Sequence, residues 1–188
     1  MVIIADQKRE LRKYMQSKRQ NMSSRFRHEE STALIDMVSG SNFFRSAKNI
    51  LVFWPLLDEP DLRPLYTSFA LEKRFYLPTV VGKSLEIRFF EGVDKMVKGN
   101  HFGILESAGE LLEDLSLIDM VLVPGVAFDM SGGRLGRGGG YYDKIIPQLS
   151  GATLFGTGFS FQLVDNVPRE HFDALVDHLF IPGMKNID

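Results

Sequence analysis

The sequence predicts an α/β fold: a three-layer α/β/α sandwich with a mostly parallel central sheet, Rossmann-like but without the dinucleotide fingerprint. Continuous apolar runs, typical of buried parallel strands, alternate with stretches of helical periodicity. A glycine-rich loop follows one of these runs and precedes a helix-forming stretch. The chain has 188 residues, of which 44% are hydrophobic and 24% are charged, as in globular proteins. We therefore expect residues 1–188 to form a single domain.

The first part of the chain predicts two helices. Residues 5–20 form a basic helix in which four side chains share roughly one side: Leu11, Tyr14, Met15 and Lys18. In the second helix Ser23 or Ser24 serves as the N-cap, because a serine hydroxyl accepts a hydrogen bond from a free N–H of the first turn. Gly40 ends this helix.

The middle of the chain predicts strands with one helix between them. Residues 49–55, "NILVFWP", form a continuous β-rich run, as in a buried strand. A helix follows at 61–73, with Asp61 as its N-cap. Residues 74–80 and 85–91 are separated by "VGKS" and predict a hairpin or two short strands.

The last part predicts a strand over 119–123, ended by Pro124, and a helix from 141 to about 149. Two further strands are expected within 153–160 and 173–182. The glycine-rich loop comes directly after the 119–123 strand. Ligands of parallel sheets bind at the carboxyl ends of the strands, so this loop is well placed for a binding site.

Composition excludes several classes of protein. The net charge of −2 argues against a general nucleic-acid binder, although it leaves room for a local basic pocket. The chain has no cysteine, which rules out disulfides, thiolate nucleophiles and cysteine-ligated zinc. The four-residue apolar run at the N-terminus is too short for a signal peptide, and no stretch could span a bilayer. We expect a cytoplasmic protein that binds neither membranes nor nucleic acid.

Residues 128–145, "FDMSGGRLGRGGGYYDKI", hold six of the 17 glycines together with two arginines and two tyrosines. They match neither of two common glycine motifs. The P-loop needs a lysine followed by serine or threonine after its last glycine, and the dinucleotide fingerprint starting at Gly136 needs a glycine where Tyr141 stands.

The loop nevertheless has the chemistry of a phosphate site. Successive glycines let backbone N–H groups turn toward an anion, and the helix beginning near Tyr141 adds its positive end. The guanidinium groups of Arg134 and Arg137 can each form bidentate hydrogen bonds with phosphate oxygens. Asp143 is placed to hold a Mg²⁺ ion that bridges the phosphates. The alternative is a flexible surface loop with an ordinary acidic residue in the first helical turn.

Residues 123–143, "VPGVAFDMSGGRLGRGGGYYD", resemble the signature of the 5-formyltetrahydrofolate cyclo-ligase family, also called 5,10-methenyltetrahydrofolate synthetases. The core of that signature is AFDxxGxRLGxGxGYYD, and each of its fixed positions is present here. The resemblance implies catalytic roles for Arg134, Arg137 and Tyr141. It implies ATP binding by Lys8, Arg12, Arg134, Leu135, Gly136, Arg137, Gly138, Gly139, Gly140, Tyr141 and Tyr142. It implies folate binding by Trp54, Glu59, Arg137, Gly138, Gly139, Gly140 and Tyr141.

The resemblance extends beyond the loop. "KRELRKYM" resembles the K-x-x-x-R opening of the family, which places Lys8 and Arg12 on one helical face; a solvated basic helix is the alternative. Asp173 matches an acid that, with Asp143, would hold Mg²⁺, and Asp177 is the weaker candidate. Two positions depart from the pattern, Leu62 for a threonine and Ser107 for a proline.

Other residues have smaller expected roles. We expect Gly103 and Glu106 to organise a turn, and we expect Tyr142 to pack mainly in the core. No role follows for His171 or His178.

The reaction that the resemblance implies is the ATP-dependent cyclisation of 5-formyltetrahydrofolate to 5,10-methenyltetrahydrofolate, through a phosphorylated formyl (imidate phosphate) intermediate, with release of ADP and phosphate. The expected partners are Mg²⁺, ATP and the folate, with or without a polyglutamate tail, bound by a monomer. Two other classes stay open: a sugar-phosphate isomerase or acyl-CoA transferase of similar layering, and a non-catalytic protein that binds nucleotide or stores folate. The formation of methenyltetrahydrofolate with and without Mg·ATP separates all three.

Overall fold

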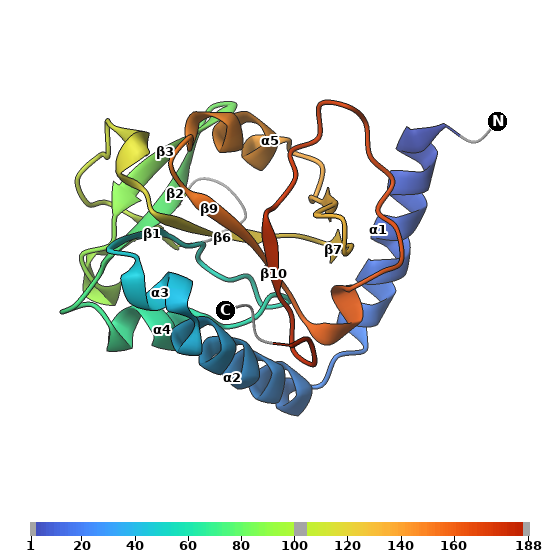
Figure 1. Ribbon diagram of the computed structural model, residues 1–188, viewed down its shortest axis with the longest axis horizontal. Helices are drawn as coiled ribbons and strands as arrows, with labels where there is room; N and C mark the ends of the chain where they lie inside the picture. The colour runs from blue at the N-terminus through green and yellow to red at the C-terminus, as the bar shows by residue number, and fades with distance from the viewer. Residues whose placement is uncertain (1–2, 100–104, 186–188) are drawn as a thin grey trace.

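A six-stranded sheet forms the centre of the molecule in the computed structural model, which describes residues 3–99 and 105–185 (Figure 1). Its strands, in spatial order, are β10 (His178–Phe180), β9 (Thr153–Thr157), β6 (Met120–Pro124), β1 (Asn49–Leu51), β2 (Arg74–Val81) and β3 (Ser84–Phe89). The pairs from β10 to β2 are all parallel, and only the edge strand β3 runs antiparallel, in a hairpin with β2. The predicted, mostly parallel sheet is thereby confirmed.

Alternate residues of the parallel strands point to opposite faces of the sheet, as the period of two requires. Ile50, Met120 and Leu122 belong to one apolar cluster, whereas Leu51 and Val121 belong to another. The first cluster is covered by α2 (Ser24–Gly40), α3 (Asn42–Ser46) and α4 (Arg63–Ser68), and the second by α5 (Tyr141–Ile145) and the 3₁₀ turn η3 (Ile146–Gln148). Figure 1 shows these two groups on opposite sides of the sheet. The three layers are confirmed.

Several small elements complete the fold. β4 (Met96–Lys98) pairs with β5 (Leu105–Ser107), and β7 (Ala127–Phe128) pairs with β8 (Arg134–Leu135). Three further 3₁₀ turns are η1 (Val93–Lys95), η2 (Leu115–Leu117) and η4 (Ser160–Gln162). In the part of the chain that the structure describes, no helix has the length and apolar character needed to cross a membrane.

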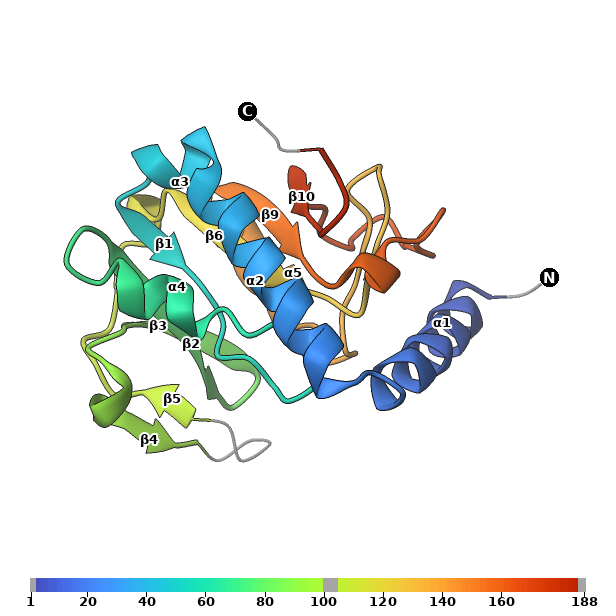
Figure 2. The same ribbon diagram turned by 90° about the horizontal axis from the view of Figure 1, so that it is seen from below.

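The N-terminal helix α1 (Ile4–Gln20) stands apart from the other helices, beside β7 (Figures 1 and 2). It packs through Met15 into a third apolar cluster, which includes Ala127 and Leu135 of the small β7–β8 sheet. The helix itself was predicted correctly, but only part of the face expected to pack against the rest of the protein does so. Met15 is fully buried, whereas Tyr14 is 54% exposed and Lys18 is exposed. Because the β7–β8 sheet is small, α1 contacts it only along a narrow strip of apolar side chains.

Three elements differ in extent from the prediction. The strand expected over 49–55 ends at Leu51, because the chain then leaves the ladder toward a pocket while staying largely buried. The helix expected at 61–73 is confined to α4, and its N-cap is Leu62. Asp61 is not the N-cap; its carboxylate binds the main chain and the side chain of Arg63. At α2 the serine cap is confirmed, since the Ser23 hydroxyl accepts from Phe26 N at 3.1 Å.

Candidate active site

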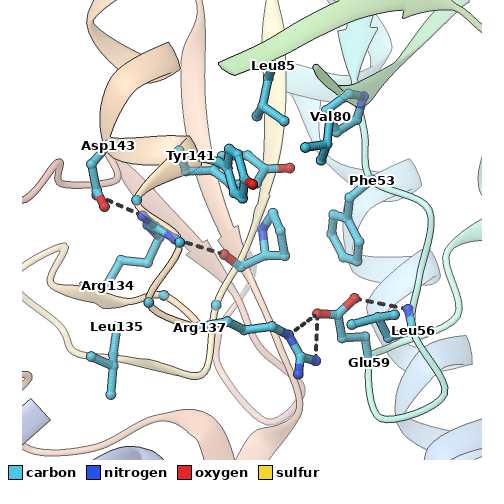
Figure 3. Close-up of a pocket in the computed structure, with 18 of the residues that line it drawn as sticks. Phe53, Leu56, Glu59, Val80, Leu85, Arg134, Leu135, Arg137, Tyr141 and Asp143 are labelled. Atoms are coloured by element: carbon cyan, nitrogen blue, oxygen red, sulfur yellow. Dashed lines mark hydrogen bonds and ion pairs between the residues drawn. The ribbon is translucent and has the colours of Figure 1, made fainter. Parts of the chain in front are cut away.

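A cavity of about 450 Å³ opens at the carboxyl ends of the adjacent strands β6, β1 and β2 (Figure 3). Residues that follow β6 and β1 line it, as does the last part of β2. This is the position where parallel sheets bind ligands. The weaker metal candidate, Asp177, does not line this cavity; its carboxylate accepts from Leu154 N at 2.8 Å. All the other site residues predicted from the sequence do line it: Lys8, Arg12, Trp54, Glu59, Arg134, Leu135, Gly136, Arg137, Gly138, Gly139, Gly140, Tyr141, Tyr142, Asp143 and Asp173.

The glycine loop connects β8 to α5 in a conformation that its sequence makes accessible. Gly138 has φ +108° and Gly140 has φ +66°, and side chains other than hydrogen are strained in this region. Gly140 is the N-cap residue of α5, so its left-handed turn lets the helix begin directly at Tyr141. The main chain of the loop is thereby brought to the wall of the cavity.

Arg134 is the buried arginine of the loop, with a side chain that is 4% exposed. Its Nη2 donates to Asp143 Oδ1 at 2.8 Å, and its Nη1 donates to Pro124 O at 3.3 Å. The guanidinium also lies over the ring of Tyr142 at 5.5 Å from the centroid. Arg134 therefore ties the start of the loop to α5 and to the end of β6.

Arg137 is half-exposed and reaches across the cavity to a different segment of the chain. Its Nε and Nη2 donate to Glu59 Oε1 at 3.1 and 2.9 Å, and Nη2 also donates to Asp58 Oδ1 at 2.7 Å. These two carboxylates outweigh the effect of burial, which would lower the pKa of Arg137, and the net result is a raised pKa. The second oxygen of Glu59 accepts from Leu56 N at 3.0 Å. Figure 3 shows the contacts of Glu59 with Arg137 and with Leu56.

Helix α1 contributes two cations to the cavity, one turn apart. Lys8 Nζ donates to Asp173 Oδ2 at 2.5 Å, and both side chains are at most 15% exposed. Arg12 Nε donates to Gly136 O at 2.9 Å, which anchors the helix to the glycine loop. Burial would raise the pKa of Asp173, but the hydrogen bond and charge of Lys8 outweigh it, so the pKa is lowered. The interpretation of this helix as a solvated basic surface is wrong for these two residues.

Apolar side chains form the other wall of the cavity. Phe53, Val80 and Leu85 face the ring of Tyr141 across an open slot (Figure 3). Trp54 lines the same cavity. A flat aromatic ligand fits between such walls, because aromatic and aliphatic side chains cover a ring face without competing for its polar edge.

Tyr142 contacts both the apolar core and the cavity. It lines the cavity and also packs against the apolar cluster that includes Ile145 and Leu149. Burial raises the pKa of its hydroxyl, which has no hydrogen-bond partner among the described residues. The expected core packing of Tyr142 is therefore present, beside a place on the cavity wall.

Asp143 and Asp173 both line the cavity. Asp143 Oδ1 accepts from Ala174 N at 3.4 Å, so the main chain next to Asp173 contacts Asp143. Mg²⁺ is commonly held by one or two carboxylates and by the phosphates of its substrate. The pair fits that arrangement, although each carboxylate is also paired with a cation, Arg134 or Lys8. No group of three or more carboxylates and histidines suited to a metal is present in residues 3–99 and 105–185.

Two residues that the sequence reasoning missed support this site. Asp58 binds Arg137, and Arg19 binds Asp58 from the last turn of α1. A signal for Arg19 was present in the sequence, since it lies seven residues after Arg12 and eleven after Lys8, on one helical stripe. No sequence signal connects Asp58 to this stripe, because the contact depends on how α1 docks.

A third missed residue, Asp129, shapes the start of the glycine loop. It is 2% exposed, and its carboxylate accepts from the main-chain N–H groups of Ser131, Gly133 and Val167 at 2.8 to 3.0 Å. Burial would raise its pKa, but these hydrogen bonds and that of the Ser131 hydroxyl hold it below the usual value. Asp129 fixes the turn that leads into Arg134.

The remaining predictions concern the neighbouring segments. Neither departure from the family pattern lines the cavity: Leu62 is fully buried in the core, and the Ser107 hydroxyl donates to Phe89 O at 2.5 Å. Glu106 accepts from Val80 N at 3.3 Å and also lines the cavity. Gly103 lies outside the described residues.

The fold and the cavity define an α/β enzyme that acts on small molecules, with a cationic glycine loop facing an apolar slot. More specifically, the chain belongs to the 5-formyltetrahydrofolate cyclo-ligase family, whose sequence model matches residues 4–182. The 5-formyltetrahydrofolate cyclo-ligase of Haemophilus influenzae is 28% identical over 176 residues, which cover 89% of this chain and 93% of that protein. The Escherichia coli K12 enzyme of the same name is 30% identical, over 73% of this chain and 79% of its own.

Solved structures agree with the sequence relatives. The 5,10-methenyltetrahydrofolate synthetase of Aquifex aeolicus superimposes with a TM-score of 0.85 at 34% identity, covering 94% of this chain and 90% of that one. That of Mycoplasma pneumoniae, at 22% identity and a TM-score of 0.73, supports the fold alone. The family predicted from the glycine signature is confirmed.

Proposed function

We propose that this enzyme uses ATP to cyclise 5-formyltetrahydrofolate to 5,10-methenyltetrahydrofolate. The observation that carries the proposal is the pairing of two walls in one cavity. The glycine loop and α1 supply cations and N–H groups suited to phosphates, and the opposite wall is an apolar slot suited to a flat ring. The family and its relatives are named 5-formyltetrahydrofolate cyclo-ligases, which supports the cyclisation step of the proposal.

The phosphates of ATP would lie along the glycine loop. Lys8 and Arg12 reach this region from α1, and Arg137 is the half-exposed guanidinium of the loop. Phosphoryl transfer asks the protein mainly for positioning and charge neutralisation, so these side chains and the loop main chain suffice without a nucleophilic residue. Arg134, which is buried against Asp143, would hold the shape of the loop and add positive charge behind it.

The folate would occupy the apolar slot. The carboxylate of Glu59, whose side chain is 9% exposed, lines the cavity and can accept paired hydrogen bonds from the amino-pyrimidinone edge of a pterin. Trp54 and Tyr141 would cover the ring system. In this arrangement the formyl group would point toward the glycine loop.

The chemistry has two steps. The formyl oxygen attacks the γ-phosphorus of ATP, the bond to the bridging oxygen breaks, and ADP leaves. N10 of the folate then attacks the activated formyl carbon, loses its proton, and phosphate leaves with the carbon–oxygen bond electrons. Negative charge develops on the leaving oxygen of ADP in the first step and on the oxygen of the departing phosphate in the second. Both oxygens would lie next to Arg137 and the N–H groups of the loop.

Asp143 and Asp173 would hold a Mg²⁺ ion, which when bound neutralises phosphate charge. We also propose that the protein works as a monomer, since every side chain assigned above comes from one chain. The folate is expected with or without a polyglutamate tail.

The test is an absorbance assay for methenyltetrahydrofolate with the purified protein. We expect product only when ATP and Mg²⁺ are both present, with ADP and phosphate formed in equal amounts. Product without ATP would contradict the proposal. Binding of both ligands without any product would indicate a storage or binding protein instead.

A further inference from the structure

A chain of ion pairs runs from the end of α1 into the cavity. Arg19 Nη1 donates to Asp58 Oδ2 at 3.1 Å, and Asp58 Oδ1 accepts from Arg137 Nη2 at 2.7 Å. Arg137 in turn binds Glu59. Two arginines thus bracket one carboxylate, and Asp58 joins the buried guanidinium of Arg19 to the half-exposed guanidinium that lines the cavity.

Arg19 is the fixed end of this chain. Its side chain is 5% exposed, and its Nη2 donates to Gly125 O at 2.9 Å. The same carbonyl accepts from Gln162 Nε2 at 2.7 Å, so the guanidinium is held against Gly125 of the cavity wall. Burial and the charge of Arg137 lower the pKa of Arg19, and Asp58 opposes both effects. Because a buried cation is costly without a partner, the contact between Arg19 and Asp58 fixes where that carboxylate stands.

Asp58 stays ionised in this position. Burial alone would raise its pKa, but the hydrogen bonds and charges of Arg137 and Arg19 outweigh burial and hold the pKa below its usual value. Its two oxygens are divided, one for each arginine. Asp58 therefore acts as a bridge with no spare strong acceptor for a ligand.

Arg137 is consequently shared between two carboxylates. Its Nη2 serves Asp58 and Glu59 together, while Nε serves Glu59 alone. Glu59 is the group proposed above to accept from the pterin, and a guanidinium fully paired with it would compete with the folate. If Asp58 lost its charge, Glu59 would become the only carboxylate partner of Arg137 among the described residues.

We propose that Asp58, held by Arg19, is a positioning residue that keeps Arg137 at the cavity wall and leaves Glu59 available to the folate. The inference rests on the proposed function. It assigns to Asp58 and Arg19 an effect on folate binding, although neither side chain lines the cavity.

The main test compares Asp58→Asn with Asp61→Asn. Asp61 lies on the same segment and pairs with Arg63 Nε at 2.7 Å, but it does not line the cavity and makes no contact with Arg137. In Asp58→Asn we expect the KM for 5-formyltetrahydrofolate to rise about tenfold, because Glu59 must then break a stronger charge-assisted pair. The KM for ATP should change less than about twofold, and Asp61→Asn should leave both constants within about twofold.

A second variant tests the role of Arg19 with a side chain that keeps the charge. Arg19→Lys loses the two-pronged donation to Asp58 and Gly125, so we expect the KM for the folate to rise about threefold. The double variant Arg19→Lys/Asp58→Asn should match Asp58→Asn alone, because both changes act through one bridge. Thermal unfolding of each variant serves as the folding control.

The outcomes separate the two proposals. A wild-type protein that makes no methenyltetrahydrofolate with Mg·ATP contradicts the proposed function. Wild-type turnover with equal effects of Asp58→Asn and Asp61→Asn contradicts the positioning role. Effects of Arg19→Lys and Asp58→Asn that multiply in the double variant contradict the bridge.

Discussion

The two arginines of the glycine loop stand three residues apart, yet they occupy opposite environments. Arg134 is 4% exposed, and its charge is matched within the loop and α5 by Asp143. Arg137 is 43% exposed, and its partners Asp58 and Glu59 come from a distant segment of the chain. The two arginines of this motif therefore have different roles. The buried arginine ties the loop to α5, and the half-exposed one lines the cavity, where it is proposed to bind phosphate.

The largest effect should come from breaking the buried pair. Arg134→Met leaves Asp143 without its cation, and we expect a loss of about 3 kcal/mol in the free energy of unfolding, toward the low end for buried pairs because Asp143 is partly exposed. Urea unfolding of the variant and the wild type measures this difference. A loss below about 1 kcal/mol would mean that the pair does not hold the loop.

The matched change at the other arginine should affect catalysis and leave the fold intact. In Arg137→Met we expect turnover to fall about a hundredfold, because a donor to the developing phosphate charge is lost. Its free energy of unfolding should fall by about 1 kcal/mol, less than in Arg134→Met. The Arg137 side chain is 43% exposed and Asp58 keeps Arg19 as a partner, so the cost comes mainly from Glu59, which loses its cation. Near-normal turnover would contradict a role of Arg137 in binding phosphate. A large loss of stability would mean that Arg137, like Arg134, is needed to hold the fold.

The contrast can be sharpened at the carboxylate that Arg137 shares with the proposed folate. Glu59→Gln keeps the shape of the side chain but loses the charge that favours paired donors. We expect the KM for 5-formyltetrahydrofolate to rise about tenfold while the KM for ATP stays within about twofold. Glu29→Gln, on the exposed surface of α2, is the control. An equal rise in both KM values would mean that Glu59 supports the whole cavity and does not select the folate.

The smallest effect concerns the pair between Lys8 and Asp173, on the same side as Arg134. The pKa of Asp173 is lowered in the folded protein, so its contribution to stability is present above the usual value of 3.8 and is lost as the pH falls through the folded pKa. Asp173→Asn should be about 1 kcal/mol less stable than the wild type at pH 7. The difference should shrink as urea unfolding is repeated toward pH 3. A difference that does not depend on pH would show that charge is not its cause.

Sequence patterns predicted those parts of the molecule in which the signal is local. Apolar runs placed the parallel strands, because each strand is buried on both faces and tolerates few polar residues. The serine hydroxyl before α2 placed its start, because a cap is satisfied within four residues. The glycine signature identified most of the predicted site residues, because they lie in one short loop.

The remaining features depend on how distant segments pack. β1 ends after three residues because the chain must turn into the cavity, and the apolar character of residues 52–54 continues past that end. Arg19 is buried because α1 docks beside β7, which a hydrophobic pattern cannot distinguish from a solvated basic helix. The bridge through Asp58 joins α1 to the glycine loop across more than a hundred residues of sequence, so no local signal contains it.

The docking of α1 has a thermodynamic consequence. Met15 and Arg19 are the only buried residues of α1, so polar contacts from Lys8, Arg12 and Arg19 carry much of its attachment to the rest of the molecule. Lys8 and Arg12, on the same helix, line the cavity. A ligand that binds these two cations must also stabilise the attached state of the helix, by the reciprocity of linked equilibria. Ligand binding in the cavity should therefore slow amide hydrogen exchange along the whole of α1, including turns that no ligand touches.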